Sequence, residues 1–383
     1  MRIAVDAREL SGRPTGVGRY LSALLVEWGT LPEARAHSFT LYASSLPASA
    51  ESIEPAALGQ IAGWRLLAGH GGTLWEQVKL PVALRRDRPD VLFAPAYTAP
   101  VASFVPHVLT VHDLSFLTHP EWFRSRERLR RVWVTRMAAA SAALVLTDTE
   151  FSKREIVHLL RLPSERVRAI PLGVRRPAGD RPAEEAAGPG APGHLGREPL
   201  ILFAGSVFNR RHVPDLIRAF AALTASHPEA RLAIAGDNRT YPFEDLAACA
   251  ADAGVADRVV IHDYVQDQTL NALYRRATVF AFLSEYEGFG LPPLEALSSG
   301  VPVLVLDTEV AREVYGDAAV YVRPGDIEGT ARSLSNLLED ADLRASLLRR
   351  ATRVLARYSW ERTARETLSA LESAAGTRRG ARA

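Results

Sequence analysis

Short apolar runs alternate with longer amphipathic segments along most of the chain. The runs are rich in Val, Ile, Leu and Phe, and the segments between them repeat apolar positions every three or four residues. This alternation predicts βαβ units built on parallel sheets. In the first half, strands are expected at Ile3–Asp6, Phe39–Ala43, Asp90–Ala94, His107–Val111, Ala143–Thr147 and Val167–Ile170, and helices at Val17–Trp28, Thr73–Arg86, Ser125–Ser141 and Glu150–Leu160.

A Pro- and Gly-rich stretch, residues 174–199, interrupts this pattern, which resumes after it. The expected strands are then Leu200–Ala204, Arg231–Ala235, Val259–His262, Val279–Leu283, Val303–Leu306 and Ala319–Val322, and the helices are Pro214–Ala225, Phe243–Ala253, Asp267–Arg276, Leu291–Ser299 and Ile327–Leu338. Two doubly wound, Rossmann-like α/β domains are therefore predicted, at 1–173 and 200–357, with 174–199 as a linker. Such sheets leave ligand crevices at the carboxyl ends of their strands, so two facing domains would enclose a central cleft.

Composition narrows the class of protein. Of the 383 residues, 47% are hydrophobic and 23% are charged, and the net charge of +2 creates no field that calls for nucleic acid. A single cysteine, Cys249, excludes an internal disulfide and is typical of a reducing compartment. No apolar stretch reaches the roughly 18 residues that cross a bilayer, and the first residues predict a strand rather than a signal peptide. We therefore expect a cytoplasmic protein.

The segment SEYEGFGLPPLEALSSGVPVLV, residues 284–305, carries the strongest chemical signal. A buried strand should end just before it, and a helix should begin after its glycine turn. Backbone amides at such a helix start favour an anion such as phosphate, and the two flanking carboxylates can accept hydrogen bonds from hydroxyls of one ligand. Phosphate and hydroxyls together describe a sugar nucleotide, whereas the alternative is a simple helix-capping turn. The residues concerned are Glu287, Gly288, Phe289, Gly290, Leu291 and Glu295.

Two adjacent arginines, Arg210 and Arg211, follow the strand predicted at Leu200–Ala204 and precede a helix near Pro214. Adjacent guanidinium groups at the carboxyl end of a strand can neutralise a departing diphosphate. The alternative is a solvated pair of charges before a helix.

Gly16 and Gly18, in TGVGRY, lie near the start of the first predicted helix. They do not form a dinucleotide-binding fingerprint, because the third glycine and the tight turn after the strand are missing. They would let the backbone approach a bulky ligand closely, or they serve loop geometry alone.

His112 and Asp113 should point into the cleft from the end of the strand His107–Val111. A histidine at a strand end is commonly a structural residue, and Asp113 could orient it or cap a helix. The triplet Asp340-Ala341-Asp342 looks like a metal-binding signature, but its place between two helices favours capping. We expect no metal and no cofactor, because the arginines and helix termini already supply positive charge.

These segments together resemble the retaining GT-B glycosyltransferases of family 4. The likeness covers almost the whole chain, through TGVGRY (15–20), VHDLSF (111–116), TEFSKREI (149–156), GSVFNRRHVPDLIRAF (205–220), 284–303 and YSWERTARETL (358–368). It implies a GT-B fold in which a terminal helix, within 358–383, crosses back onto the first domain. That helix has apolar positions at helical spacing, at Trp360, Ala364, Leu368 and Leu371.

The resemblance also implies roles for individual residues. Glu287 would hold hydroxyls of the donor hexose, Glu295 the nucleotide ribose, and His112 the hexose through its ring or carbonyl. The arginine pair would bind the donor diphosphate, although the family usually has Lys where Arg211 stands. The remaining donor-binding positions implied are Gly16, Gly18, Gly205, Ser206 and the turn from Gly288 to Leu291.

The predicted activity is transfer of a hexose from a nucleoside diphosphate sugar to a hydroxyl of a saccharide or lipid-linked saccharide, with retention at the anomeric carbon. Resemblance of the first half to bacterial polysaccharide mannosyltransferases, from Trp75-Glu76-Gln77 to His119–Trp122, makes GDP-mannose the favoured donor. A nucleotide-sugar epimerase of the same fold and a non-catalytic sugar-nucleotide-binding partner are the alternatives.

Residues 122–136 combine Trp122, Phe123 and Trp133 with six arginines. A basic helix with aromatic side chains can lie on the anionic inner face of a membrane, where a lipid-linked acceptor is found. It can equally be an ordinary solvated helix.

Overall fold

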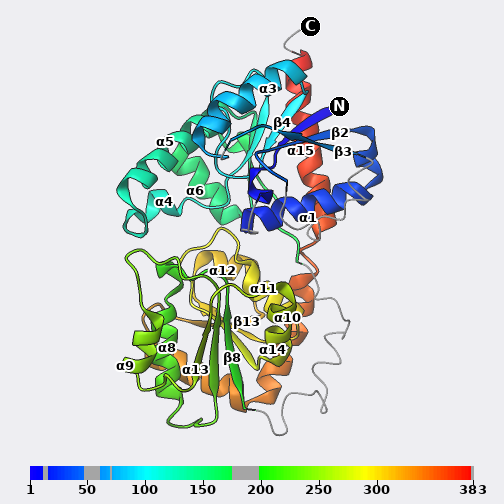
Figure 1. Ribbon diagram of the computed structural model, residues 1–383. Helices are drawn as coiled ribbons and strands as arrows, with labels where there is room; N and C mark the ends of the chain where they lie inside the picture. Colours follow the sequence, from blue (N-terminus) through cyan, green and yellow to red (C-terminus); the bar gives the residue numbers. More distant parts are fainter. Residues whose placement is uncertain (12–15, 47–60, 70, 175–197, 381–383) are drawn as a thin grey trace. The chain divides into compact units, whose positions relative to one another are not determined.

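The computed structural model describes residues 1–11, 16–46, 61–69, 71–174 and 198–380 (Figure 1). The chain forms two compact units. Unit 1 contains Met1–Thr118, Ser125–Gly173 and the C-terminal residues from Tyr358, and unit 2 contains His119–Arg124 and Val174–Arg357. The stretch predicted as a linker falls almost entirely outside the described residues. No helix within the described ranges is both long and apolar enough to cross a bilayer.

Unit 1 is built on a parallel sheet in the strand order β3-β2-β1-β4-β5-β6-β7. The order of the first six is that of a Rossmann fold, with the switch point between β1 and β4. Its strands are β1 (Arg2–Asp6), β2 (Ser38–Ala43), β3 (Ala62–Leu66), β4 (Val91–Ala94), β5 (His107–Thr110), β6 (Leu144–Thr147) and β7 (Val167–Ala169).

Helices cover the unit 1 sheet, whose central strands are buried along their whole length. They are α1 (Gly16–Thr30), α3 (Leu80–Asp87), α4 (Ser115–Thr118), α5 (Ser125–Ser141), α6 (Glu150–Leu160) and α15 (Trp360–Gly380), with a π-helical turn η4 (Trp75–Lys79) leading into α3. Two short 3₁₀ turns are η1 (Arg8–Leu10), in unit 1, and η5 (Pro120–Trp122), in unit 2.

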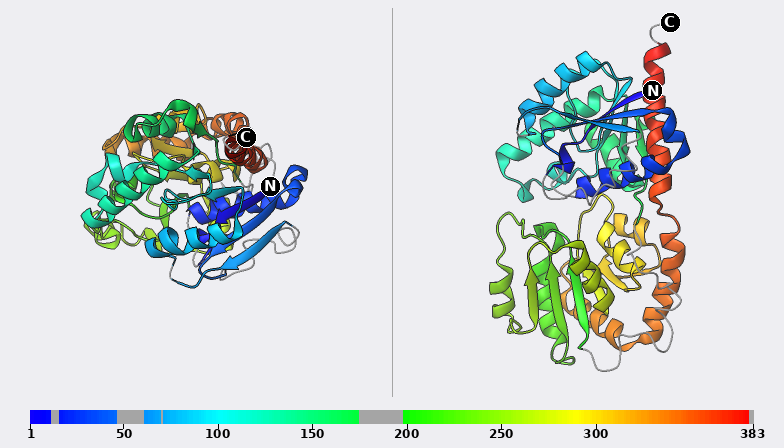
Figure 2. Two further views of the ribbon diagram at one scale, coloured as in Figure 1. Left: turned by 90° about the horizontal axis from the view of Figure 1, so that it is seen from above. Right: turned by 45° about the vertical axis from the view of Figure 1, so that its right-hand side comes forward.

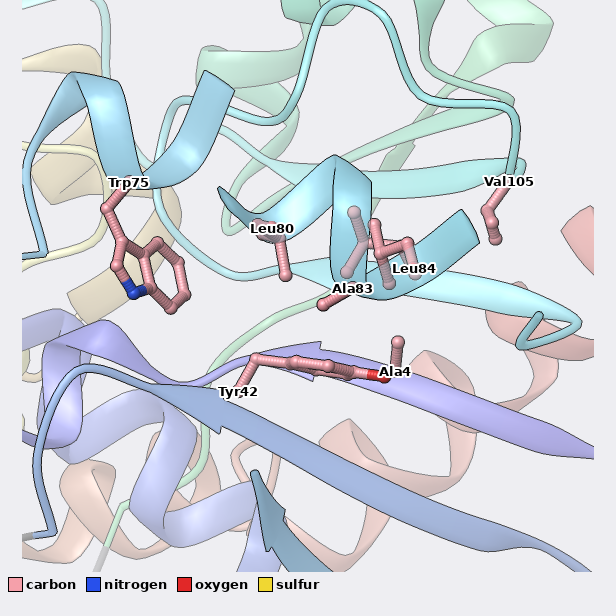
Figure 3. Packing of buried hydrophobic residues seen from close by; sticks show 8 residues of the cluster. Ala4, Tyr42, Trp75, Leu80, Ala83, Leu84 and Val105 are labelled. Carbon is pink, nitrogen blue, oxygen red and sulfur yellow. The ribbon is translucent and has the colours of Figure 1, made fainter. Parts of the chain in front are cut away.

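The η4–α3 segment packs one apolar face on strands β1, β2 and β4 (Figure 3). Trp75 enters this core while its indole Nε1 donates to the Leu67 carbonyl at 2.8 Å, so burying the ring leaves no polar atom unsatisfied. The cluster comprises Ala4, Tyr42, Trp75, Leu80, Ala83, Leu84, Leu92 and Val105.

The last helix, α15, belongs to unit 1 although almost the whole of unit 2 precedes it in sequence. Figure 2 shows it, in red, beside α1. The Trp28 indole of α1 donates to the Ala364 carbonyl at 3.0 Å, and the Thr363 hydroxyl donates to the Pro171 carbonyl at 2.7 Å. Apolar side chains of α15, including Leu368 and Leu371, are buried against the unit.

Unit 2 repeats the architecture on a parallel sheet in the order β10-β9-β8-β11-β12-β13, again with a Rossmann switch point, here between β8 and β11. Its strands are β8 (Leu200–Ala204), β9 (Arg231–Ala235), β10 (Val259–His262), β11 (Val279–Phe282), β12 (Val303–Leu306) and β13 (Ala319–Val322). Its helices are α8 (Val213–Leu223), α9 (Leu246–Asp252), α10 (Asp267–Arg276), α11 (Leu291–Ser298), α12 (Glu309–Tyr315), α13 (Ile327–Glu339) and α14 (Ala341–Leu355), with a 3₁₀ turn η7 (Asn209–Arg211) before α8.

Candidate active site

Glu287 lies in the loop that joins β11 to α11, at the carboxyl edge of the unit 2 sheet. Its Oε1 accepts hydrogen bonds from Arg211 Nε at 2.8 Å and from Ser284 Oγ at 2.9 Å, and Arg210 Nε lies 3.8 Å from the same oxygen. Burial alone would raise the pKa of Glu287, but the guanidinium groups of Arg211 and Arg210 outweigh it and hold the pKa below its ordinary value. Glu287 is therefore a carboxylate held among cations at the switch point.

The two arginines of η7 have different surroundings. Arg211 is buried, with Nη1 donating to the Ser206 carbonyl at 2.7 Å and its guanidinium carbon 4.7 Å from the centre of the Phe282 ring. A Cβ on Gly205, where φ is +125°, would lie 2.7 Å from that Nη1, so the glycine makes room for the buried cation. Arg211 thus organises the loop and orients Glu287, while the neighbouring Arg210 is half-buried.

A glycine turn leads from Glu287 into α11. Gly290 caps the helix with φ +85°, and its carbonyl accepts a hydrogen bond from the Tyr315 hydroxyl at 2.8 Å. Pro292 lies in the first turn of the helix, where its missing N–H has no helical partner to lose. The structure therefore has the predicted strand, turn and helix in that order. The backbone amides at the start of α11 follow the end of β11, in the arrangement that favours an anion.

Glu295 follows one turn along α11 and is half-buried. Its Oε2 accepts a hydrogen bond from the Tyr274 hydroxyl of α10 at 3.2 Å. Unit 2 thus contains Glu287, Glu295, Arg210 and Arg211, together with Gly205, Ser206 and the Gly288–Leu291 turn.

His112 belongs to unit 1, where it follows β5. Its Nδ1 lies 2.8 Å from Asp148 Oδ2 and its Nε2 lies 3.0 Å from the Pro95 carbonyl oxygen. Both partners are hydrogen-bond acceptors, an arrangement that favours the doubly protonated imidazolium, in which both ring nitrogens donate. Burial opposes this charge, but Asp148 and then the Pro95 carbonyl outweigh it and raise the pKa of His112.

Two residues beside His112 escaped the sequence analysis. Asp148 is buried directly after β6, and the Tyr20 ring of α1 packs edge-on against the imidazole with centroids 5.0 Å apart. The signal for Asp148 was its place at the carboxyl end of a predicted strand, where it could have been paired with His112. Asp113 caps α4 instead, since its Oδ1 accepts from the Ser115 amide at 2.9 Å.

Gly16 is the first described residue of α1, and Gly18, two residues further along, is buried. The φ angle of Gly16 is not in the left-handed region, and no atom of the described residues lies within 4 Å of an ideal Cβ built there. Close approach of a ligand to the helix start stays a prediction for Gly16, beside the alternative that the glycine serves the geometry of the loop before it. Thr15 of the same motif lies outside the described residues.

The acidic triplet after α13 is a capping segment. Asp340 accepts from the Leu343 amide at 2.8 Å and so caps the N-terminus of α14. In the part of the chain that the structure describes, no group of three or more His, Cys, Asp or Glu side chains could hold a metal ion.

Trp122 and Phe123 lie outside the basic helix, because α5 begins at Ser125, as the sequence predicted. Trp122 lies in η5, where it stacks on His119 with ring centroids 4.0 Å apart. The His119 ring in turn packs edge-on against Tyr286, the residue before Glu287, at 5.2 Å. His119–Arg124 belongs to unit 2, so of the three aromatic residues only Trp133 lies on the basic helix, and membrane contact stays a prediction.

Comparison with known proteins matches both halves of the chain to protein families. Residues 14–176 match the family described as glycosyltransferase family 4, and residues 189–354 match glycosyl transferases group 1. O-antigen chain mannosyltransferase B of Escherichia coli is 28% identical over 274 residues, which cover 70% of this chain and 71% of the relative. D-inositol 3-phosphate glycosyltransferase of Acidothermus cellulolyticus is 31% identical over 290 residues, 72% of this chain and 64% of the relative.

A third relative is the serotype-specific mannosyltransferase WbdA of Escherichia coli, 25% identical over 317 residues, 79% of this chain but 39% of WbdA. Among solved structures, HepE of Anabaena in complex with UDP and glucose has a TM-score of 0.72 at 17% identity and covers 97% of this chain and 99% of its own. WaaG, a glycosyltransferase involved in lipopolysaccharide biosynthesis, has the same TM-score, identity and coverage. These two likenesses concern the fold.

Proposed function

Since the chain is a glycosyltransferase of the GT-B class, with a family 4 domain ahead of a group 1 domain, we propose that it moves a hexose from a nucleoside diphosphate sugar to a hydroxyl acceptor with retention of anomeric configuration. The observation that carries the proposal is the Glu287–Arg211–Arg210 cluster at the switch point of unit 2. It combines a carboxylate for hydroxyls with cations for a diphosphate, beside a helix start that presents amides.

In the proposed reaction, the diphosphate leaves as the anomeric carbon gains positive charge. Arg210 and the amides of the Gly288–Leu291 turn stabilise the negative charge of the leaving group. Arg211 keeps Glu287 ionised, and Glu287 holds hydroxyls of the hexose. The acceptor hydroxyl attacks from the face that the leaving group vacates and passes its proton to the departing phosphate. No metal or other cofactor takes part in this scheme.

GDP-mannose is the proposed donor. The names of two relatives, O-antigen chain mannosyltransferase B and WbdA, support mannose, whereas the HepE structures contain UDP and glucose. We propose a saccharide or lipid-linked saccharide as acceptor, in the synthesis of a polysaccharide or glycolipid on the cytoplasmic side of a membrane.

A panel of nucleoside diphosphate sugars tests the donor class. Binding is measured by calorimetry, and release of nucleoside diphosphate is measured with and without candidate acceptors. We expect Glu287→Ala and His112→Ala to abolish turnover at saturating donor while the protein remains folded. The matched control is Asp307→Asn, because Asp307 follows the neighbouring strand β12 and pairs with Arg312 at the surface. Unchanged turnover in both alanine variants would remove these residues from the site.

The same assay separates the remaining activities. Conversion of the donor to an epimer without release of nucleoside diphosphate would establish an epimerase in place of a transferase. Tight donor binding with no turnover on any acceptor would instead indicate a non-catalytic binding partner. Failure of every nucleoside diphosphate sugar to bind would refute the proposed function.

We further propose that α5 rests on an anionic membrane surface. Leu129, Trp133 and Met137 recur every four residues along it and are 60%, 62% and 40% exposed. The helix also carries Arg126, Arg128, Arg130, Arg131 and Arg136, against Glu127 as its one acidic residue. An exposed apolar stripe within a basic helix fits a headgroup layer of anionic lipid.

A second exposed stripe lies on the neighbouring η4–α3 segment, at Leu74, Val78 and Val82, again every four residues. Arg130 Nη1 donates to Thr73 Oγ1 at 3.1 Å and so ties α5 to the start of this segment. Sedimentation with phosphatidylglycerol vesicles at low salt, compared with phosphatidylcholine vesicles, measures the contact. We expect binding to the anionic vesicles that Trp133→Ser weakens. Equal or absent binding to both kinds of vesicle would refute it.

A further inference from the structure

The loop that follows β4 holds a residue in an uncommon conformation. Tyr97 has φ +52°, in the left-handed region that non-glycine residues seldom adopt. Its amide donates to the Thr110 carbonyl at 2.8 Å, and its hydroxyl donates to Asp113 Oδ2 at 2.9 Å. Backbone strain of this kind persists only where the surroundings hold it in place, and it concentrates at functional sites.

The residues that hold this loop come from the π-helical turn η4. Glu76, only 3% exposed, accepts a hydrogen bond from Thr98 Oγ1, the hydroxyl next to Tyr97. The side-chain amide of Gln77 holds the loop residues after Thr98. Its Nε2 donates to the Ala99 carbonyl and its Oε1 accepts from the Val101 amide, each at 3.0 Å. Three hydrogen-bonding positions of the loop, at Thr98, Ala99 and Val101, are therefore set by two neighbouring side chains.

Glu76 is itself fixed by Arg8, which begins η1 after the first strand. Arg8 Nη2 lies 2.6 Å from Glu76 Oε1 and 2.7 Å from Asp6 Oδ2, and its Nη1 donates to the Gly71 carbonyl at 3.2 Å. The guanidinium also lies over the Trp75 ring, 5.3 Å from its centre. A buried carboxylate with a charged donor in this geometry has little freedom to move, because any displacement leaves a buried charge unpaired.

The loop meets His112 on two sides. At its start, the Pro95 carbonyl accepts the hydrogen bond from His112 Nε2 at 3.0 Å. Two residues later, the Tyr97 ring packs edge-on against the imidazole with centroids 5.7 Å apart. The contacts that fix the conformation of the loop therefore also fix the orientation of the His112 ring.

We propose that Glu76 is a positioning residue for His112, because it fixes the loop 95–101 whose Pro95 carbonyl and Tyr97 ring hold the imidazole. The consequence for hexose transfer rests on the proposed function, whereas the structural coupling between Glu76 and His112 does not. Glu76 makes no contact with substrate in this scheme and acts through the loop alone.

Glu76→Gln tests the coupling, since it keeps the shape of the side chain and removes its charge. The readout is the imidazole Nε2–H signal of His112 in ¹H–¹⁵N spectra of the full-length protein. We expect this signal to shift and to exchange faster with water, and the transfer rate to fall about 10- to 100-fold, as a displaced site residue does. The control is Asp87→Asn, which removes another carboxylate of unit 1, one that accepts from the Tyr42 hydroxyl at 2.8 Å, and should leave the signal and the rate unchanged.

Thr98→Val is the second variant, because it removes only the hydroxyl and leaves the Arg8–Glu76 pair intact. It should shift the same signal in the same direction, by less, and it decides the question if Glu76→Gln does not fold. An unchanged His112 signal in the folded variants would overturn the proposal, and so would a shifted signal with an unchanged transfer rate. If the wild-type protein transfers no hexose from any donor, the proposed function fails, while the signal still decides whether Glu76 positions His112.

Discussion

Replacing the glycine at the start of α11 tests how the donor turn is built. Gly290 has φ +85°, and an ideal Cβ built on it would lie 2.1 Å from the Tyr315 hydroxyl oxygen. That hydroxyl donates to the Gly290 carbonyl. An alanine at this position has to strain the backbone and also displace the tyrosine that holds it.

The magnitude follows from these two effects. A left-handed backbone costs a non-glycine residue about 1–2 kcal/mol. Displacing the Tyr315 hydroxyl also forfeits a hydrogen bond worth about 0.5–1.5 kcal/mol, and the buried carbonyl loses its donor. We expect Gly290→Ala to lower the free energy of unfolding by about 1.5–3.5 kcal/mol. Gly254 is the matched control, with φ +72° and, among the described residues, no atom within 4 Å of an ideal Cβ, so that Gly254→Ala should lose only the backbone contribution.

Urea unfolding followed by circular dichroism gives the free energy of unfolding of the two variants. Calorimetry with the donor measures how tightly the turn binds it. Gly290→Ala should weaken donor binding, whereas Gly254→Ala should not. In the double variant Gly290→Ala/Tyr315→Phe, the losses should be less than additive, because the clashing hydroxyl is gone. Equal destabilisation by Gly290→Ala and Gly254→Ala would refute the close approach as the reason for this glycine.

Three further predictions concern other parts of the molecule. Trp28→Ala should lower the free energy of unfolding of unit 1 by about 3–5 kcal/mol in urea titrations, because it empties a core site and removes the bond to α15; a loss under 1 kcal/mol would contradict this. Asp148→Asn should lower the pKa of His112 in NMR titrations. In wild type the protonated imidazole stabilises the fold below about pH 6.5, and this stability is lost as pH rises through the raised pKa; in the variant most of it should be absent. An unchanged pKa of His112 would be contrary evidence. Arg211→Met should raise the pKa of Glu287. On acidification the variant should therefore lose stability at a higher pH than wild type, in which the depressed pKa preserves stability to lower pH. Superimposable acid unfolding curves would rule out the pairing.

The alternation of apolar runs and amphipathic segments was sufficient to predict most of both sheets, because central parallel strands are covered on both faces and leave continuous apolar runs. It missed β3, whose residues Ala62–Leu66 are mostly exposed at the sheet edge and so carry no such run. It also predicted one helix over 73–86, where a π-helical turn precedes α3. In that turn the side chains of Glu76 and Gln77 make hydrogen bonds to a loop distant in sequence, and periodicity does not encode such contacts.

The candidate site was predictable where residues are adjacent in sequence. The strand, turn and helix around Glu287 follow from local rules, and the structure has them in that order. Sequence reasoning gave Arg210 and Arg211 one shared role at the diphosphate, although Arg211 is buried against Ser206 and Phe282. It also left His112 without its partner Asp148, because pairing across neighbouring strands depends on the sheet order rather than on spacing.

The return of α15 to unit 1 constrains how the protein is made on the ribosome. The surface around Trp28 that α15 covers is synthesised early, but its cover comes last, after almost all of unit 2. At about 5–20 residues per second, translation from residue 174 to the end of α15 takes about ten to forty seconds. During that interval the nascent first unit exposes the apolar surface that α15 later covers, so chaperone demand and sensitivity to C-terminal truncation should both concentrate there.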